Sequence, residues 1–303
     1  MVGLRVVSAF LVLTAMSCGP GDSTWIRQLR HVAAEEDADV RVPVLVLEAG
    51  DTALPLLETQ LERGSPEQQE LAALGLGYLG GEESVRLLSA AHSRLTDQGE
   101  KDTSSLPEPF VREQLCRAMA STGSRDDVRF LIASLQSADS DVVRSATESL
   151  AVLRASQTLE AAAACVEREE GRRPALAQGC EWARELIRGE SHLSSTMSGG
   201  TSELDRIVSA VLASGVPIEL DGVGALSAGI RWNPSGRWQF AFLEFPDRKA
   251  EVQFRIYVTE DGRRSLVETN YSCGLLCGAG YESALLKDQG QWRVTSLRLS
   301  WLS

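Results

Sequence analysis

Histidine is scarce in this chain, and the motifs of several common enzyme classes are missing. Only three histidines occur among 303 residues, His31, His92 and His192, and no two of them have the spacing of a metal-binding pair. We find no GxSxG elbow and no HExxH helix, and we expect no glycine-rich phosphate loop. The sequence therefore predicts a protein that is not an enzyme and that holds neither a cofactor nor a metal ion.

Basic residues are also few. The chain has 30 Lys and Arg against 42 Asp and Glu, which gives a net charge of −12. Most of the acidic excess lies in residues 1–200, with 30 acidic and 19 basic side chains, whereas residues 201–303 carry 12 and 11. Proteins bind nucleic acid through Lys and Arg that displace counterions from phosphates. We therefore expect no nucleic-acid partner, and the acidic N-terminal part favours protein partners with basic patches.

The apolar run near the amino terminus is too short to cross a bilayer. Arg5 is followed by twelve uncharged, mostly apolar residues, Val6–Ser17, whereas a spanning helix needs about 20. A positive residue, a short apolar run and small residues at its end are typical of an export signal. The ending Ala15-Met16-Ser17-Cys18-Gly19 resembles the lipobox of bacterial lipoproteins, with Ala15 where Leu is usual. The resemblance implies a signal peptide and lipobox over residues 1–18, with Cys18 diacylated as the new amino terminus.

An ordinary secretory signal cleaved near Cys18 is the alternative, and both interpretations predict export from the cytoplasm. Two or three acyl chains would anchor the protein stably in a membrane, since each buried methylene contributes about 0.8 kcal/mol. Gly19 differs from the Asp that resembles an inner-membrane retention signal, so the outer membrane of a bacterial cell envelope is favoured where one exists. Residues 19–26 are polar and predict a short tether.

Three stretches share an apolar-periodic run, a Gly or polar break, and a second apolar-periodic run. They cover residues 71–91, 115–135 and 146–166, and residues 42–61 form a weaker copy. A helical pair this short cannot bury its apolar face alone, so the copies are predicted to stack into an α-solenoid over residues 27–190, whose concave side is open for contact. The units resemble HEAT repeats of the compact bacterial type, and the resemblance implies antiparallel helix pairs used for protein–protein contact.

The spacing of the copies is regular except for one insertion. The first aliphatic residues after the breaks are Leu54, Val85, Val128 and Leu159, in steps of 31, 43 and 31 residues. The long step contains the polar segment 93–109. We interpret this segment either as a recognition loop on one edge of the stack or as a disordered bulge.

Six cysteines are present, of which Cys18 is assigned to the lipid. Cys165 and Cys180 lie in successive helical segments on either side of a break, so a disulfide between them is predicted in an oxidising compartment. Cys116 lies on the apolar face of a repeat helix and is expected to be buried and unpaired. Cys273 and Cys277 bracket a short turn, where we favour a local disulfide. The alternatives there are a zinc site, which would need two more ligands, and a redox pair, whose usual spacing is shorter.

The hydrophobic period changes from 3.6 to 2 after a Ser- and Gly-rich linker at residues 191–203. The domain 204–303 is predicted to begin with an amphipathic helix, 204–214, and to continue as a curved antiparallel meander. In the last strand the apolar set moves from even to odd positions, which predicts a bulge near Thr295 or Ser296. The strands are expected at residues 237–245, 251–259, 265–271, 280–288 and 291–302.

The carboxy-terminal element, with its cysteine–glycine pairs and final Trp-Leu-Ser, resembles a domain of uncharacterised exported bacterial proteins. One helix ahead of a bent sheet also resembles the cone shared by nuclear transport factor and ketosteroid isomerase. Enzymes on that cone use a carboxylate base beside Tyr or Asp donors, and Tyr257, Tyr271 and Glu268 are of suitable type, although they are most simply sheet-face residues. The aromatic residues could line a ligand pocket or form a packed core, and they are Trp232, Trp238, Trp292, Trp301, Phe240, Phe242 and Phe254.

The sequence as a whole predicts an exported, lipid-anchored, non-enzymatic scaffold or adaptor that binds protein partners at the bacterial cell envelope. The first alternative is a protein that binds a small apolar or amphipathic ligand inside the curved sheet, with or without chemistry. The second alternative is a purely structural role.

Overall fold

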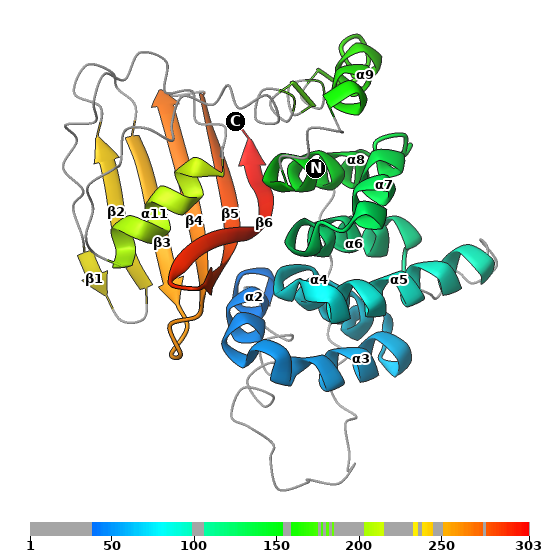
Figure 1. Cartoon of the computed structure of the whole chain (residues 1–303), viewed down its shortest axis with the longest axis horizontal. Coiled ribbons are helices and arrows are strands. Elements are labelled where there is room, and N and C mark those ends of the chain that lie inside the picture. The colour runs from blue at the N-terminus through cyan, green and yellow to red at the C-terminus, as the bar shows by residue number, and fades with distance from the viewer. Residues whose placement is uncertain are drawn as a thin grey trace, which may run out of the picture.

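The computed structural model shows a helical N-terminal part followed by an antiparallel sheet (Figure 1). The predicted signal segment with Cys18, the tether and most of the linker lie outside the described residues. The described residues are 38–98, 106–153, 159–174, 177, 180, 181, 184, 203–214, 233–235, 238–244, 251–274 and 277–302.

The helices of the N-terminal part come in consecutive pairs, and the predicted breaks fall between the members of a pair. Leu54, Val85, Val128 and Leu159 each lie at or near the start of the second helix. The pairs are α2 (Ala38–Ala49) with α3 (Leu54–Arg63), joined by the 3-10 turn η1 (Gly50–Ala53); α4 (Pro66–Leu79) with α5 (Gly81–Gln98); α6 (Glu108–Thr122) with α7 (Arg125–Ser134); and α8 (Ser140–Leu153) with α9 (Leu159–Glu169).

Local chemistry explains where these helices begin and end. Ser65 caps α4 and Ser124 caps α7, each in a capping box closed by the side chain three residues later. Gly80 and Gly123 follow α4 and α6 with φ angles of 63° and 62°, which favour glycine because it has no Cβ.

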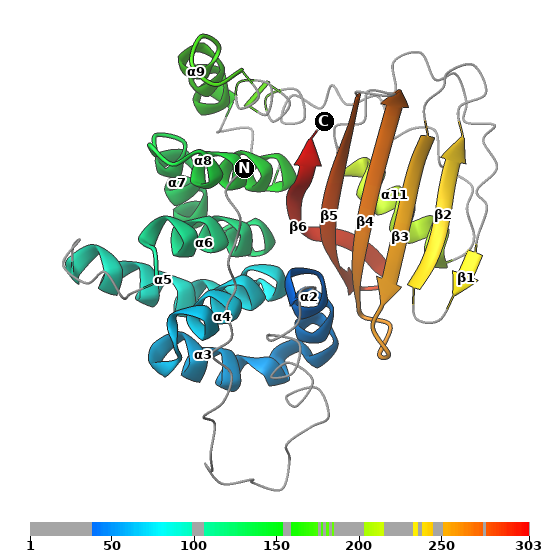
Figure 2. The ribbon, with the colours of Figure 1, turned by 180° about the vertical axis from the view of Figure 1, so that it is seen from behind.

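The two helices of a pair differ in how much of their surface is buried. In α4 every residue from Ala72 to Tyr78 is buried, and α6 and α8 contain similar runs at residues 114–120 and 145–151. In α3, α5 and α7 buried and exposed positions alternate at helical spacing. Helices α2, α4, α6 and α8 therefore form an inner layer that lies between the outer helices and the sheet (Figures 1 and 2).

The sheet is an antiparallel meander in which neighbours along the chain are neighbours in space. In β6, Thr295 has no partner residue, because Val294 lies opposite Leu285 and Ser296 lies opposite Ala284. This confirms the predicted bulge. The strands are β1 (Asn233–Ser235), β2 (Trp238–Glu244), β3 (Glu251–Val258), β4 (Arg264–Gly274), β5 (Cys277–Asp288) and β6 (Gln291–Leu302).

Helix α11 (Glu203–Ala213) covers one face of the sheet, whereas the other helices meet the sheet along β6 and at part of the opposite face (Figure 2). Helix α11 lies across its face and buries Ile207 and Val211 against Phe254 and Val267 (Figure 1). On the other face Tyr257, together with Leu266 and Ala284, belongs to the hydrophobic core of the helical part. Successive side chains of a strand point to opposite faces, which explains how one strand contributes to both cores.

The connection within the polar segment 93–109 is shorter than the composition of that segment predicts. Helix α5 continues to Gln98 and α6 begins at Glu108, so only the residues between them connect the two helices. Leu95 packs against the helical core, which extends the apolar periodicity of α5 past the expected end. Residues 99–105 of the segment lie outside the described residues.

The letters GxGxxG occur at Gly75, Gly77 and Gly80. In the structure Gly75 and Gly77 lie inside α4, not in a turn between a strand and a helix, which is where phosphate-binding glycines lie. A Cβ at Gly75 would lie 3.1 Å from a methyl carbon of Val46, and one at Gly77 would lie 2.8 Å from the side-chain oxygen of Gln114. These glycines allow α4 to pack closely between its neighbours.

Candidate functional site: the contact between the helices and the sheet

The inner layer of helices does not present an open wall. Helix α2 packs against β4, and α6 and α8 pack against β6, so the sheet covers the side of the inner layer that faces away from the outer helices (Figure 2). The prediction that the stack leaves this side open is therefore wrong. The physical reason is that the inner helices are buried around most of their circumference and need a second surface to cover them.

The first polar contact joins α2 and η1 to the hairpin of β3 and β4. The hydroxyl of Tyr257 donates to the Glu48 carboxylate at 2.9 Å, and the main-chain N–H of Glu260 donates to the same carboxylate. Next to it, the Arg264 guanidinium pairs with Asp51 at 2.8 Å. Gly50, with a φ of 55°, permits this approach, since a Cβ there would lie 2.4 Å from Arg264 Nη1.

The second contact joins α4 to β5 and β6. The Tyr78 hydroxyl donates to the Glu282 carboxylate, and Arg298 Nη1 donates to the Tyr78 oxygen at 3.3 Å. The Arg117 guanidinium of α6 lies over the Tyr78 ring, 5.4 Å from its centre. Burial, followed by the Glu282 charge, raises the pKa of Tyr78, so this side chain stays a neutral hydrogen-bond donor.

Arg117 is itself buried, with 1% of its surface exposed. Its Nη2 pairs with Glu113 at 2.8 Å, and its Nη1 donates to Gln114. Among the described residues, its Nε has no hydrogen-bond partner. A buried cation with two partners on its own helix, placed over an aromatic ring of α4, ties α6 to α4.

The third contact joins α8 to β6. Glu148 is 4% exposed, and its Oε1 accepts a hydrogen bond from the main-chain N–H of Leu299 at 3.0 Å. Because β6 is an outer strand of the sheet, this N–H points away from β5 and would otherwise lack a ladder partner. Burial raises the pKa of Glu148 to about 7, although the Leu299 hydrogen bond and the charge of Arg144 act in the opposite direction.

A row of charged residues crosses the sheet between these contacts. Arg255, Glu268, Glu282 and Arg298 lie directly opposite one another on β3, β4, β5 and β6. Arg255 pairs with Glu268 at 3.3 Å, and Arg298 lies 3.7 Å from Glu282. Burial, and then repulsion from Glu282, raises the pKa of Glu268, while Arg255 lowers it. The row fixes the register between the strands on the side that meets the helices.

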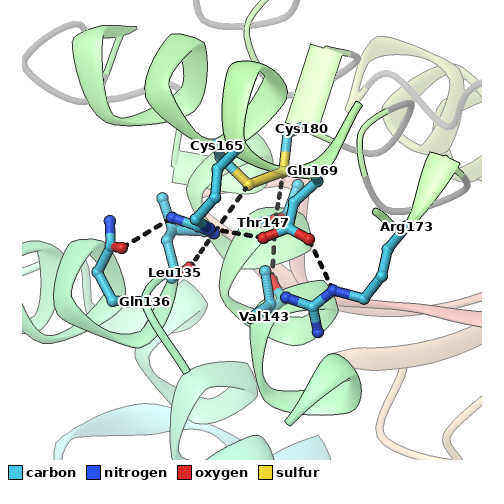
Figure 3. The surroundings of a disulfide bond; sticks show 9 residues. Leu135, Gln136, Val143, Thr147, Cys165, Glu169, Arg173 and Cys180 are labelled. Atoms are coloured by element: carbon cyan, nitrogen blue, oxygen red, sulfur yellow. Dashed lines mark hydrogen bonds and ion pairs between the residues drawn. A yellow bond between two sulfur atoms is a disulfide. The ribbon is translucent and has the colours of Figure 1, made fainter. Parts of the chain in front are cut away.

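The disulfide between Cys165 and Cys180 is present, as predicted (Figure 3). Around it the carboxylate of Glu169, which is fully buried, accepts from Arg173 Nε and from Arg168 Nε, each at 2.6 Å. Arg168 also donates to the Leu135 carbonyl and to Gln136. This cluster ties the end of α9 to the end of α7. Its arginines, Arg173 first, lower the pKa of Glu169 to about 2.

The remaining predicted cysteine sites have different outcomes. Cys116 is buried and unpaired, as expected, and burial raises the pKa of its thiol to about 12, which leaves it inert. The backbone of Cys277 pairs with Gly274 at the closed end of the β4–β5 hairpin. The side chains of Cys273 and Cys277 lie outside the described residues, so their disulfide stays a prediction.

The described aromatic residues of the carboxy-terminal part lie in packed surroundings. Phe254 belongs to the core under α11, and Trp292 lies at its edge, where its Nε1 donates to Glu203 at 2.9 Å. Tyr257 and Glu268 are sheet-face residues, as the simpler interpretation has it, and Tyr271 packs against the α11 core. For Trp232, Trp238, Trp301, Phe240 and Phe242 the side chains lie outside the described residues.

His92 is the described histidine of the three, and it has a structural role. Its Nε2 lies 2.7 Å from Glu108 Oε1, and its ring packs edge-on against Phe130. This contact joins the end of α5 to the start of α6 at the base of the connection between them. His31 and His192 lie outside the described residues.

The outer helices present charged side chains to the surroundings. Arg86 of α5 pairs with Glu83 on its own helix at 2.6 Å and with Glu58 of α3 at 3.3 Å, and all three are exposed on at least two fifths of the side chain. Glu62, Glu82 and other acidic side chains nearby are exposed. This surface of α3 and α5 is thus polar and richer in acid than in base.

Sequence reasoning missed the residues that make the contact with the sheet. Arg117 and Glu148 stand inside runs of small and apolar residues on helices, and this interruption is the signal that could have identified them as buried charges. Tyr78 gives no such signal, because a tyrosine in an apolar run is ordinary core composition.

Comparison of the chain with known protein families, with curated proteins and with solved structures finds no match. Within the described part of the chain, no helix combines the length and apolar character that crossing a membrane requires. No group of three or more His, Cys, Asp or Glu residues within that part is placed to hold a metal ion.

Proposed function

We propose that this chain is an exported, lipid-anchored, non-enzymatic scaffold or adaptor that binds protein partners at the bacterial cell envelope. In this proposal the helix pairs are HEAT-like repeats of an α-solenoid, and Cys18 carries the lipid. The observation that carries the proposal is the layered stack itself. Its inner helices are sealed against the sheet, while the outward sides of α3, α5 and α7 are exposed.

Two further features support parts of the proposal. A buried disulfide between Cys165 and Cys180 fits a protein that matures in an oxidising compartment, because cytosolic thiols are kept reduced. The exposed acidic side chains on α3 and α5 fit partners with basic patches, since complementary charge favours encounter and orientation. In this proposal the docking surface lies on the exposed sides of the outer helices.

Crosslinking and affinity capture from envelope fractions test the binding part. We expect Glu62→Lys combined with Glu82→Lys to reduce capture of a basic partner at least tenfold, because two attractive charges become repulsive. Asp288→Lys, at an exposed position on the sheet, is the matched control and should leave capture unchanged. Equal capture by both variants would contradict an outer-layer docking surface.

The intact mass of the protein extracted from membranes tests the anchor. The proposal requires a chain that begins at Cys18 and carries acyl groups, and the same mass counts the disulfides. An unacylated mature chain would contradict the lipid anchor and would leave the docking surface to be judged separately.

A further inference from the structure

Glu148 is a buried carboxylate with no ionic partner in contact among the described residues. Its Oε1 accepts a hydrogen bond from the main-chain N–H of Leu299, and no Lys, Arg or His of the described residues lies within ion-pair distance of it. Glu169, equally buried, is held by two arginines. A carboxylate removed from water without a counter-ion is costly when ionised, whereas its protonated form is not.

The charged groups around Glu148 do not offset that cost. Arg144, one turn earlier on α8, is paired with Asp141 at 2.8 Å, and Arg117 of α6 is paired with Glu113. Both cations favour the ionised form of Glu148, whereas Glu113 opposes it. From β5, Tyr281 faces the same carboxyl group and is neutral, since burial and Glu148 raise its pKa. The protonated form therefore fits this site better than the ionised form.

We propose that the contact between Glu148 and Leu299 is a pH-sensitive clasp, which holds the carboxy-terminal half of β6 on α8 at acidic pH and loosens it at alkaline pH. The clasp is independent of the proposed function, since it concerns the fold of the isolated chain. When it opens, residues 296–302 leave α8 and the α6–α8 end of the inner layer becomes accessible. The layer that the sheet seals would then be available in one pH range and covered in the other.

The direction of the pH dependence follows from how tightly the closed and open forms of the clasp bind a proton. The closed clasp raises the pKa of Glu148 from its ordinary value near 4.5 to about 7. The closed form thus binds a proton more tightly than the open form, and it is favoured fully below the ordinary value. As the pH rises from there to about 7, the ratio of open to closed clasp grows by up to about tenfold per pH unit. Above that range it stays constant.

Hydrogen exchange of the full chain between about pH 5 and about pH 8.5, corrected for the intrinsic rate, tests the clasp. We expect the protection of amides 296–302 and of α8 to fall with pH, while the amides of α11 and β3 keep theirs. Glu148→Gln retains an acceptor for Leu299 but cannot ionise, so its protection should not depend on pH. Asp288→Asn, which removes an exposed carboxyl group, should behave as the wild type does.

A second variant keeps the clasp testable if Glu148→Gln does not fold. Glu148→Leu removes both the charge and the acceptor, so it should lower the protection of amides 296–302 at every pH, again without a pH dependence. Wild-type protection that does not change with pH, or a Glu148→Gln profile equal to that of the wild type, would overturn the clasp. Equal loss of protection in α11 would overturn it too, because the opening would then be global.

Discussion

Helix α11 covers its face of the sheet with aliphatic side chains, whereas the helical layer meets the opposite face and the β6 edge through carboxylates, hydroxyls and arginines. Ile207, Val208, Val211 and Leu212 make the first contact. Glu48, Tyr78 and Glu148 make the polar part of the second. Apolar burial is insensitive to pH and non-directional, while a buried polar contact depends on each partner and on its ionisation.

The difference shows how two parts of one chain can be joined in a specific way. An apolar face determines that two surfaces meet but allows several relative positions. The Tyr78–Glu282–Arg298 group and the Glu48–Tyr257 bond can form in one relative position only, so they set how the helices sit on the sheet. The α11 contact is thus expected to contribute most of the stability, and the polar contact most of the specificity.

The largest effect is expected in the α11 contact. Ile207→Ala should lower the free energy of unfolding by about 2–5 kcal/mol, because a fully buried aliphatic side chain leaves a cavity. Urea unfolding measures it. Arg206→Ala, at an exposed position on the same helix, should stay within about 0.5 kcal/mol of the wild type. A small effect of Ile207→Ala would mean that α11 is not part of the cooperative core.

The next effect is expected at Tyr78. Tyr78→Phe removes the hydroxyl but keeps the ring under Arg117, so Glu282 and Arg298 lose a buried partner. We expect a loss of about 1–3 kcal/mol in the free energy of unfolding, the usual cost of an unmet buried polar group. A double-mutant cycle with Glu282→Gln measures the coupling between the two groups. Strictly additive losses would show that the hydrogen bond contributes nothing.

Acid should act on the α9 end in the opposite sense to its action on the clasp. The folded state lowers the pKa of Glu169 to about 2, so its contact with Arg168 and Arg173 stabilises fully above the ordinary value near 4.5. That contribution is lost as the pH falls toward 2. Glu169→Gln should be less stable at neutral pH and should lose less stability in acid, as measured by urea unfolding across pH. Glu160→Gln, at an exposed position of α9, should retain the wild-type slope.

The smallest effect is expected on the outer layer. Arg86→Ala breaks the contacts with Glu83 and Glu58, but all three side chains are exposed. Exposed pairs of this kind contribute little to the free energy of unfolding, and salt weakens them further. Thermal unfolding at low and high salt should show a small difference that disappears at high salt. A loss as large as that of Tyr78→Phe would place Arg86 among the contacts that hold the fold.

The local features of the fold could be predicted from the sequence to a large extent. Hydrophobic period and turn chemistry predict the breaks before Leu54, Val85, Val128 and Leu159, the five long strands and the bulge at Thr295. The disulfide between Cys165 and Cys180 followed from spacing between helical segments. Each of these depends on residues that are close in the chain, where pattern and local geometry are directly linked.

The contact between helices and sheet could not be predicted in the same way. Glu148 and Leu299, or Tyr78 and Glu282, are far apart in the sequence, and nothing in either segment identifies its partner. Periodicity identified one apolar face on each repeat helix, while α4, α6 and α8 are buried on two. The second face is hard to recognise in the sequence where it carries small residues such as Gly75 and Gly77. These residues allow close packing but add little to the hydrophobic pattern.

By itself the sequence determined the helix pairs, the meander of strands and the local cross-link, because periodicity, turn residues and cysteine spacing act over a few residues. Only the tertiary structure decided that the sheet seals the inner layer and that Glu148 is buried without a counter-ion. The physical reason is that burial, and the pKa that burial shifts, depend on which distant surfaces meet. A glutamate in a helix is written the same way in the sequence whether its side chain faces water or a strand.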